Sequence, residues 1–247
     1  MGRWSQRLAM PFLEFAGVPW RGRVLDAGCG TGSLTLPLAA HHRGLDRIDA
    51  LDFADDFVAA LRARVDDPRI RARQGDVCAL PYDDASFDAA YSLLVLHFVS
   101  DPDRAIAQMR RVLRPGALAA ATVWASGGMP SWRLFWDTVL IHEPTAERIA
   151  PVRRPLTGGG ELRVAFERAG FTQVVETTLT ISMDYANFDD FWYPTAYGQG
   201  RFGAFFDDLP EKRRIRLREA VREAYCAGER EGPRSFPSTA LAVRCIA

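Results

Sequence analysis

The stretch at residues 24–34, which reads VLDAGCGTGSL, constrains the fold of this chain more than any other. A short apolar strand ends at Asp26, and a helical pattern begins at about Ser33. The turn between them has glycine at alternate positions, namely Gly28, Gly30 and Gly32. Glycine tolerates positive φ and lets another molecule approach the bare backbone, while a helix start offers free N–H groups. The stretch therefore predicts a nucleotide-like ligand at the end of the first strand.

The spacing of these glycines differs from that of a dinucleotide-binding turn. The fingerprint G-x-G-x-x-G would need glycine at position 33, where this chain has Ser33. An acid, Asp26, stands two residues before the first glycine and would repel a pyrophosphate. The same acid can accept hydrogen bonds from a ligand's ammonium group or orient the glycine loop. The spacing thus disfavours a nicotinamide-dependent oxidoreductase.

This version of the motif resembles the first motif of the class I S-adenosylmethionine-dependent methyltransferases, whose sequence is much like V-L-D-x-G-C-G-T-G. Within that family it is most similar to the ubiquinone- and menaquinone-biosynthesis type. The resemblance covers residues 20–125 and implies S-adenosyl-L-methionine as the cofactor. It also implies methyl transfer to a small-molecule acceptor by in-line displacement at the sulfonium methyl. The alternatives are an NAD(P)-dependent oxidoreductase and a non-catalytic relative that only binds an adenosyl ligand.

Several downstream residues are expected to contact the same ligand. Asp52 ends the strand at residues 48–52, where a carboxylate can accept from both ribose hydroxyls, although it can also serve the following helix as an N-terminal acid. Phe53 is expected against the adenine face or packed within its loop. The resemblance implies that Asp76 accepts from the adenine amino group, whereas an Asx-turn is the structural alternative. The full set of expected cofactor-binding residues is Asp26, Gly28, Gly30, Thr31, Gly32, Asp52, Phe53, Asp76, Val77 and Ser92.

His97 is the candidate catalytic residue, in a segment that resembles the family's fourth motif. It would act as a general base toward a substrate hydroxyl, with a pKa near working pH. The alternative is a histidine whose hydrogen bonds are satisfied at a helix start. The four cysteines are scattered without C-x-x-C spacing, and the histidines lack metal-ligand spacing, so no metal is expected.

Strand and helix patterns alternate along the first half of the chain. Helical patterns lie at residues 33–41, 55–65 and 102–113, and strands at 24–26, 48–52, 70–73, 89–92 and 117–124. Such strand–helix units in series predict a parallel, doubly wound sheet. Two further strands, at residues 172–182 and 239–246, are expected as an antiparallel pair on its edge. We therefore expect an α/β, Rossmann-like, seven-stranded mixed sheet with an antiparallel C-terminal strand.

The rest of the chain is expected to complete one methyltransferase domain over residues 1–247. Residues 1–20 would form an N-terminal helix that packs on the domain or closes over the cofactor as a lid, with Arg7 near the cofactor carboxylate. Insertions at 126–160 and 183–236 would form a helical substrate cap. The aromatic stretch at 185–206 predicts either a small separate core or a substrate pocket. The pocket residues would be Trp192, Tyr193 and Tyr197.

The net charge and the hydropathy of the chain limit the kinds of partner that it is expected to bind. The formal net charge is zero, so no whole-molecule field favours nucleic acid or an anionic membrane. No apolar run is long enough to span a bilayer, and the first residues lack the apolar core of a signal peptide, so we expect a cytoplasmic protein. A small-molecule acceptor follows. The motifs do not distinguish O-, N- or C-methylation, and they do not give the oligomeric state.

Overall fold

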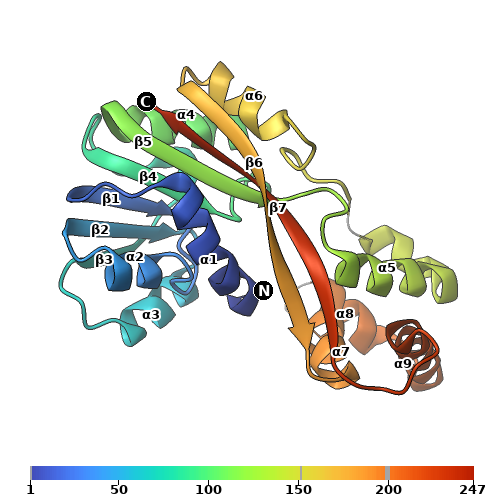
Figure 1. Cartoon of the computed structure of the whole chain (residues 1–247). Coiled ribbons are helices and arrows are strands. Elements are labelled where there is room, and N and C mark those ends of the chain that lie inside the picture. The colour runs from blue at the N-terminus through green and yellow to red at the C-terminus, as the bar shows by residue number, and fades with distance from the viewer. Residues whose placement is uncertain (1, 151, 198–200) are drawn as a thin grey trace. The chain divides into compact units, whose positions relative to one another are not determined.

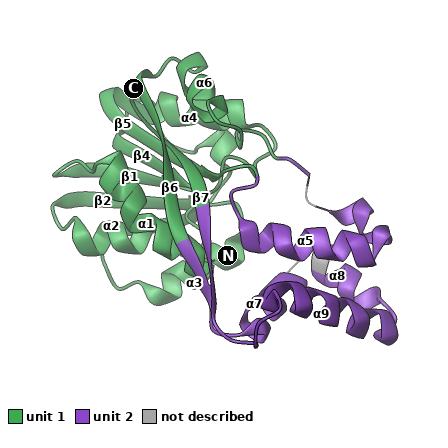
Figure 2. Cartoon of the chain, turned by 45° about the vertical axis from the view of Figure 1, so that its right-hand side comes forward, with its two compact units in different colours: residues 1–126, 154–181, 239–247 green, residues 127–153, 182–238 purple. Residues whose placement is uncertain are grey.

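The computed structural model describes residues 2–150, 152–197 and 201–247, apart from the side chains of 201 and 202. Phe202, which belongs to the aromatic stretch, therefore lies outside the described side chains. The chain divides into two compact units (Figure 2). Residues 1–126, 154–181 and 239–247 form the first, called here the sheet unit. Residues 127–153 and 182–238 form the second, called here the helical unit.

The sheet has seven strands in the order β3-β2-β1-β4-β5-β7-β6, which confirms the predicted sheet. Neighbours pair in parallel from β3 to β5, and β7 pairs antiparallel to β5 (Figure 1). The strands are β1 Gly22–Ala27, β2 Leu45–Asp52, β3 Ile70–Gln74, β4 Phe87–Leu93, β5 Leu113–Trp124, β6 Thr172–Tyr185 and β7 Arg234–Ile246. Because β1 and β4 are central, their carboxyl ends meet at the middle of one sheet edge.

Helices cover both faces of this sheet (Figure 1). One face carries α1 Gly2–Ala16, α2 Thr35–His41 and α3 Asp55–Arg64, and the other carries α4 Pro102–Val112 and α6 Glu161–Arg168. The α4 and α6 side contains a continuous core of small and branched side chains from β1, β4, β5 and β7. Asp101 caps α4 by accepting a hydrogen bond from the Arg104 amide at 3.0 Å, as its position before Pro102 predicts.

The N-terminal helix α1 packs its apolar stripe within the sheet unit. Trp4, Leu8 and Phe12 are buried, and the Tyr91 hydroxyl donates to the Gly17 carbonyl oxygen at 2.8 Å, just beyond the end of the helix. Arg7 is exposed, with its guanidinium carbon 5.3 Å from the centroid of the Trp4 ring. The helix therefore has a packing role in the structure, and its action as a lid stays a prediction.

Several element bounds differ from the predicted ones for local reasons. The fifth strand begins at Leu113, because the Arg114-Pro115-Gly116 segment runs along the sheet as an irregularity in the β4–β5 register. The Gly116 amide donates to the Ala247 carbonyl oxygen at 2.9 Å, which holds this segment in place. Residues 31–34 form turns, so α2 begins at Thr35. Strand β7 begins at Arg234, five residues before its predicted start, since 239 − 234 = 5.

The helical unit contains α5 Pro130–His142, the 3₁₀ turn η2 Pro144–Ile149, α7 Phe188–Ala196, α8 Arg201–Asp208 and α9 Glu211–Cys226. Its interior is made largely of aromatic rings in edge-to-face and tilted contacts. Glu143 joins the end of α5 to α9 through Arg213, whose Nε donates to the carboxylate at 2.8 Å. Within the described part of the chain, no helix combines the length and the apolar character that crossing a bilayer requires.

Candidate functional site

The predicted glycine turn has positive φ at all three glycines, at +88° for Gly28, +51° for Gly30 and +97° for Gly32. A Cβ at Gly28 would lie 2.3 Å from the Val95 side chain, and one at Gly32 would lie 2.6 Å from the Leu61 side chain. A Cβ at Gly30 would have no neighbour within 4 Å. Two glycines are therefore required by packing inside the protein, and Gly30 leaves its backbone open to another molecule.

Four amide N–H groups of this turn, those of residues 28, 29, 30 and 32, donate within the protein, which corrects for these residues the expectation that the loop offers its amides to a ligand. The amides of Gly28 and Cys29 both donate to the Leu51 carbonyl oxygen, at 2.7 and 2.9 Å. The Gly30 amide donates to the Asp52 carboxylate at 2.8 Å, and the Gly32 amide donates to the Cys29 carbonyl oxygen at 2.9 Å. A turn with these donors already used is poorly suited to a phosphate.

Asp52 fixes the end of β2 against the glycine turn. One carboxylate oxygen accepts from the Gly30 amide, and the other accepts from the Ala54 amide at 3.0 Å, immediately before α3. A carboxylate oxygen can accept more than one hydrogen bond, so both oxygens retain capacity for a ligand's hydroxyl groups. Phe53 follows with 75% of its side chain exposed, and its carbonyl oxygen accepts from the Gln74 side chain at 3.1 Å.

Asp26 is completely buried at the end of β1. Its Oδ2 accepts a hydrogen bond from the Thr35 hydroxyl at 2.6 Å, and its Oδ1 has no partner among the residues that the structure describes. Burial raises the pKa of this carboxyl to about 7, with the charge of Asp52 adding to the rise and the Thr35 hydrogen bond opposing it. The buried carboxyl would gain from a positively charged ligand group near Oδ1, and a second negative charge there would be unfavourable.

Asp76 caps the short 3₁₀ turn η1 Val77–Ala79. Its Oδ1 accepts from the Cys78 amide at 2.8 Å, which is the local turn considered as the structural alternative. Asp76 is exposed and Val77 is buried. The carboxylate therefore has a structural function in the chain itself, and its contact with an adenine stays a prediction.

The loop after β4 lies against the glycine turn. Ser92, fully buried, donates to the Ala27 carbonyl oxygen at 3.0 Å and so links the ends of β4 and β1. The next turn is strained, because Leu94 has φ of +61° while its amide donates to the Thr122 carbonyl oxygen at 2.8 Å. Val95 then fills the space left by the missing side chain of Gly28.

His97 lies in this loop with 3% of its surface exposed. Neither ring nitrogen has a hydrogen-bond partner in the described residues, so the imidazole is not the satisfied histidine of the structural alternative. Burial, together with the positive charge of Arg154, lowers the pKa of His97 to about 3. The prediction of a pKa near working pH is therefore wrong for the ligand-free chain, since desolvation penalises the charged ring, and His97 is neutral at pH 7.

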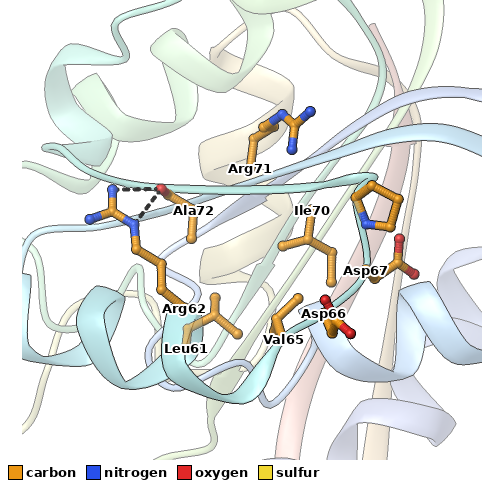
Figure 3. A pocket seen from close by; sticks show the side chains of 9 residues that line it. Leu61, Arg62, Val65, Asp66, Asp67, Ile70, Arg71 and Ala72 are labelled. Carbon is orange, nitrogen blue, oxygen red and sulfur yellow. Dashed lines mark hydrogen bonds between the residues drawn. The ribbon is translucent and has the colours of Figure 1, made fainter.

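Among the pockets of the sheet unit, two lie close to strand or helix ends. One, of about 340 Å³, adjoins the glycine turn and is lined by Gln6, Gly32, Ser33, Leu36, Pro37, Ala40 and His41. The other, of about 280 Å³, lies between the end of α3 and the start of β3 (Figure 3). Arg62 borders it and donates twice to the Ala72 carbonyl oxygen, at 3.1 and 2.8 Å. Ile70 begins β3, so this second pocket adjoins the amino end of that strand. The glycine turn follows the carboxyl end of β1, which is the opposite end of the parallel strands.

The aromatic residues predicted for a substrate pocket differ in exposure. Trp192 is 1% exposed and packs against Phe135, Phe188 and Phe206 in the interior of the helical unit. Tyr193 and Tyr197 are 55% and 41% exposed. Most of the stretch thus forms the core of the helical unit, while these two tyrosines remain accessible.

Three contacts of the site were absent from the sequence reasoning. Thr35 holds Asp26, Val95 packs against Gly28, and the guanidinium of Arg154 lies over the Phe98 ring at 4.3 Å. The contact between Thr35 and Asp26 could have been predicted from the sequence, because a threonine in the first turn of the helix after Asp26 can face back toward the strand end. The other two join segments whose proximity depends on the tertiary fold. No group of three or more His, Cys, Asp or Glu side chains in the described ranges is placed to hold a metal ion.

Comparison with known proteins places the site in context. Residues 25–121 match the family model for the methyltransferase domain. The chain is similar to the 2-phytyl-1,4-naphtoquinone methyltransferase of Trichormus variabilis, with 31% identity over 143 residues that cover 56% of this chain and 62% of that relative. It is also similar to the malonyl-[acyl-carrier protein] O-methyltransferase of Pseudescherichia vulneris, with 34% identity over 47% of this chain and 44% of that relative. The chain spans 33–62% of the length of the first four curated relatives.

Solved structures share the fold at low sequence identity. The phosphoethanolamine N-methyltransferase 2 of Haemonchus contortus, solved in complex with S-adenosyl-L-methionine, superposes with a TM-score of 0.60 at 18% identity, over 98% of this chain and 52% of that chain. The [4+2]-cyclase SpnF superposes with a TM-score of 0.57 at 23% identity, over 97% of this chain and 80% of that chain. At these identities the likeness establishes the fold alone.

Proposed function

Because this chain carries a class I S-adenosylmethionine-dependent methyltransferase domain at residues 25–121, we propose that it transfers the methyl group of S-adenosyl-L-methionine to a small-molecule acceptor. The observation that carries this proposal is the glycine turn. Its amides at residues 28, 29, 30 and 32 donate within the protein, whereas the space beside the Gly30 Cα is open. Two carboxyl groups, those of Asp26 and Asp52, flank the turn. That arrangement favours a cationic ligand with hydroxyl groups over a pyrophosphate.

The residues present fit the cofactor. Asp52 would accept from the ribose hydroxyls. The Oδ1 of Asp26, which has no partner among the described residues, would accept from the ammonium group. Gly30 and Thr31 would border the ligand through their backbone, with Gly28 and Gly32 holding the turn. Phe53 would cover the adenine, Asp76 and Val77 would border its edge, and Ser92 would shape the wall at the end of β4.

The chemistry asks little of the protein beyond alignment and the exclusion of water. When bound, the cofactor supplies a sulfonium methyl that a nucleophile can attack in line. His97 is neutral and can therefore accept a hydrogen bond, or a proton, from an acceptor hydroxyl. Its low pKa makes it a weak base, so we expect it to orient the acceptor and contribute modestly to proton removal.

The class of acceptor and the cellular location are proposed from fewer observations. The names of two similar proteins specify a phytyl naphthoquinone and a malonyl-[acyl-carrier protein], which supports a small organic group as the acceptor. The helical unit would serve as the substrate cap, with the accessible Tyr193 and Tyr197 as its acceptor contacts. The zero net charge argues against nucleic acid as a partner, and the four free cysteines are compatible with a cytoplasmic location.

A methyl-transfer assay tests this proposal. The purified chain would be incubated with S-adenosyl-L-methionine carrying an isotopically labelled methyl group and with panels of quinols, phenols, carboxylic acids and amines, and products would be resolved by mass spectrometry. The proposal expects label in one class of acceptor, with loss of transfer in Asp52→Asn and retention in the surface variant Asp56→Asn. S-Adenosylhomocysteine binding without transfer to any acceptor would instead support the non-catalytic relative.

A further inference from the structure

The face of β1, β2 and β3 that lies opposite α2 and α3 carries a group of arginine side chains. Arg71 pairs with Asp49 in the β2–β3 register, and Arg73 pairs with Leu51. Paired side chains of a parallel sheet lie on one face, and Leu51 belongs to the core on the α4 and α6 side. Figure 3 shows Arg71 on the other side of β3 from Ile70. The helices that pack on β2 and β3 are α2 and α3, so this face of the two strands is left accessible.

Two further arginines continue the group across the sheet, around the buried carboxyl of Asp49. Arg23 and Arg47 are register partners on β1 and β2. The Arg23 Nε donates to one oxygen of Asp49, and an Arg47 Nη donates to the other, each at 2.7 Å. Asp49 is 1% exposed, whereas the side chains of Arg23 and Arg47 are 27% and 45% exposed. The name arginine face is used here for Arg23, Arg47, Arg71 and Arg73.

The guanidinium groups of the arginine face have more hydrogen-bond donors than the chain itself satisfies. Each oxygen of Asp49 binds one N–H group, so Arg23 and Arg47 keep further N–H groups without partners in the described residues. Arg71 and Arg73 are exposed, and neither side chain forms an ion pair or a hydrogen bond within the described ranges. The face therefore presents positive charge and accessible N–H donors over three adjacent strands.

Tyr82 and Asp88 hold part of this face in place. The Tyr82 ring centroid lies 5.4 Å from the guanidinium carbon of Arg23 and 5.7 Å from that of Arg73, within range of cation–π contacts. The Asp88 carboxylate accepts from the Arg23 amide at 2.8 Å and is paired with Arg114. These contacts position the arginines and leave the charge of Arg73 without a carboxylate partner among the described residues.

Three observations exclude occupants other than an acidic protein segment. Strand addition is disfavoured, because β3 is the outermost strand and Arg62 already donates twice to the Ala72 carbonyl oxygen (Figure 3). A membrane is disfavoured, because β1, β2 and β3, all of whose residues the structure describes, contribute no exposed large apolar side chain. Nucleic acid is disfavoured, because the net charge is zero and the Tyr82 ring already contacts guanidinium groups.

We propose that the arginine face is a docking surface for an acidic segment of a partner protein. Carboxylates of that segment bind the accessible N–H groups of Arg47, Arg71 and Arg73, as Asp49 already binds Arg23 and Arg47. Exposed ion pairs are individually weak and are screened by salt, so the contact is reversible and strongest at low ionic strength. This inference goes beyond the proposed function and does not depend on it, because none of these arginines is among the residues expected to hold the cofactor.

Fluorescence anisotropy of a labelled hexaglutamate peptide tests the surface, with a labelled hexaglutamine peptide as the uncharged comparison. At low ionic strength we expect the full chain to bind hexaglutamate and not hexaglutamine, with an affinity that falls as salt is added. The double variant Arg71→Gln, Arg73→Gln should weaken hexaglutamate binding about tenfold, as the loss of two exposed ion pairs implies. The same variant should keep its affinity for S-adenosylhomocysteine.

The double variant Arg104→Gln, Arg230→Gln is the matched control, because it removes two positive charges from exposed positions outside the arginine face. It should retain hexaglutamate binding. No binding of hexaglutamate, equal binding of hexaglutamine, or equal weakening by the two double variants would overturn the proposal.

Two other polyanions test the identity of the occupant. Tighter binding of single-stranded hexathymidylate or of phosphatidylserine vesicles, lost in Arg71→Gln, Arg73→Gln, would overturn the proposal by assigning the face to a nucleic acid or to a membrane. Thermal unfolding of each variant shows that binding is compared between folded proteins. Failure of S-adenosylhomocysteine to bind the unmodified chain would count against the proposed function alone.

Discussion

Two buried carboxyl groups, one in each unit, differ in how fully the chain itself satisfies them. Glu143 of the helical unit is 3% exposed, and Asp26 of the sheet unit is 0% exposed. Burial raises the pKa of Glu143, but hydrogen bonds from Thr145 and Arg213 outweigh that effect and hold its pKa below the usual value. Among the residues that the structure describes, Thr35 alone hydrogen-bonds to Asp26, and the pKa of Asp26 rises to about 7.

The difference extends to the surroundings of each group. Around Glu143 the chain supplies a guanidinium and a hydroxyl, so nothing further is required. Around Asp26 it supplies a second carboxyl, Asp52, and leaves Oδ1 without a partner in the described residues. A buried group of this kind lowers stability unless something else compensates it. This difference supports our proposal that the end of β1 receives a ligand, whereas Glu143 in the helical unit is satisfied by contacts within the chain.

The contrast between the helical unit and the end of β1 would be wrong if the interior of the helical unit proved to be a pocket. Trp192→Ala should lower the free energy of unfolding by about 3–5 kcal/mol, because it removes a large side chain that is 1% exposed. Tyr193→Ala, at an adjacent residue that is 55% exposed, should change it by less than about 0.5 kcal/mol. Chemical denaturation measures both. A Trp192→Ala protein of unaltered stability would show that the ring lines a space and does not fill a core.

The stability of the protein as a function of pH tests the raised pKa of Asp26. Its folded-state pKa of about 7 lies above the ordinary value of 3.8, so its stabilising contribution is full below about pH 4 and is lost as the pH rises through about 7. The loss is roughly 4 kcal/mol as an order of magnitude. Asp26→Asn should therefore gain stability relative to the wild type between pH 4 and pH 8 by an amount of that order. Parallel stability curves for the two proteins over this range would contradict the raised pKa.

The glycine turn allows a comparison within one loop. Gly28→Ala combines a left-handed backbone with a clash at 2.3 Å and should cost about 2–4 kcal/mol of stability. Gly30→Ala has the strain without the clash and should cost about 1–2 kcal/mol. For cofactor binding we expect the opposite order, with a larger loss of affinity in Gly30→Ala than in Gly28→Ala. The added methyl group of Gly30→Ala enters the space where we expect the cofactor. Equal stability losses in the two variants would show that Val95 moves aside freely.

Asp52 is expected to contribute more to ligand binding than to stability. Asp52→Asn should weaken S-adenosylhomocysteine about 10- to 100-fold, since one charged acceptor is lost. Asn retains one acceptor oxygen for the Gly30 or Ala54 amide, so the fold should persist. Asp56→Asn, at an exposed position in the first turn of α3, is the control. Affinity that is unchanged in Asp52→Asn would remove the ribose assignment.

The sequence predicted those features that depend on local pattern. Strand and helix alternation predicted the seven-stranded sheet, and the glycine spacing predicted the positive φ at residues 28, 30 and 32. It did not predict that the amides of this turn bond to Leu51 and Asp52, because those contacts depend on the β1–β2 register. Nor did it predict the low pKa of His97, which follows from burial and from Arg154, 57 residues further along (154 − 97). The aromatic stretch at 185–206 left two interpretations open because composition does not give burial.

We propose that the glycine turn binds an adenosyl sulfonium cofactor and not a dinucleotide. Isothermal titration of the full chain with S-adenosylhomocysteine, NADH and NADPH tests it most directly. We expect S-adenosylhomocysteine to bind with a dissociation constant at least about 100-fold below that of either dinucleotide, equivalent to about 2.7 kcal/mol. Tighter binding of NADH or NADPH, or equal binding of all three ligands, would contradict it.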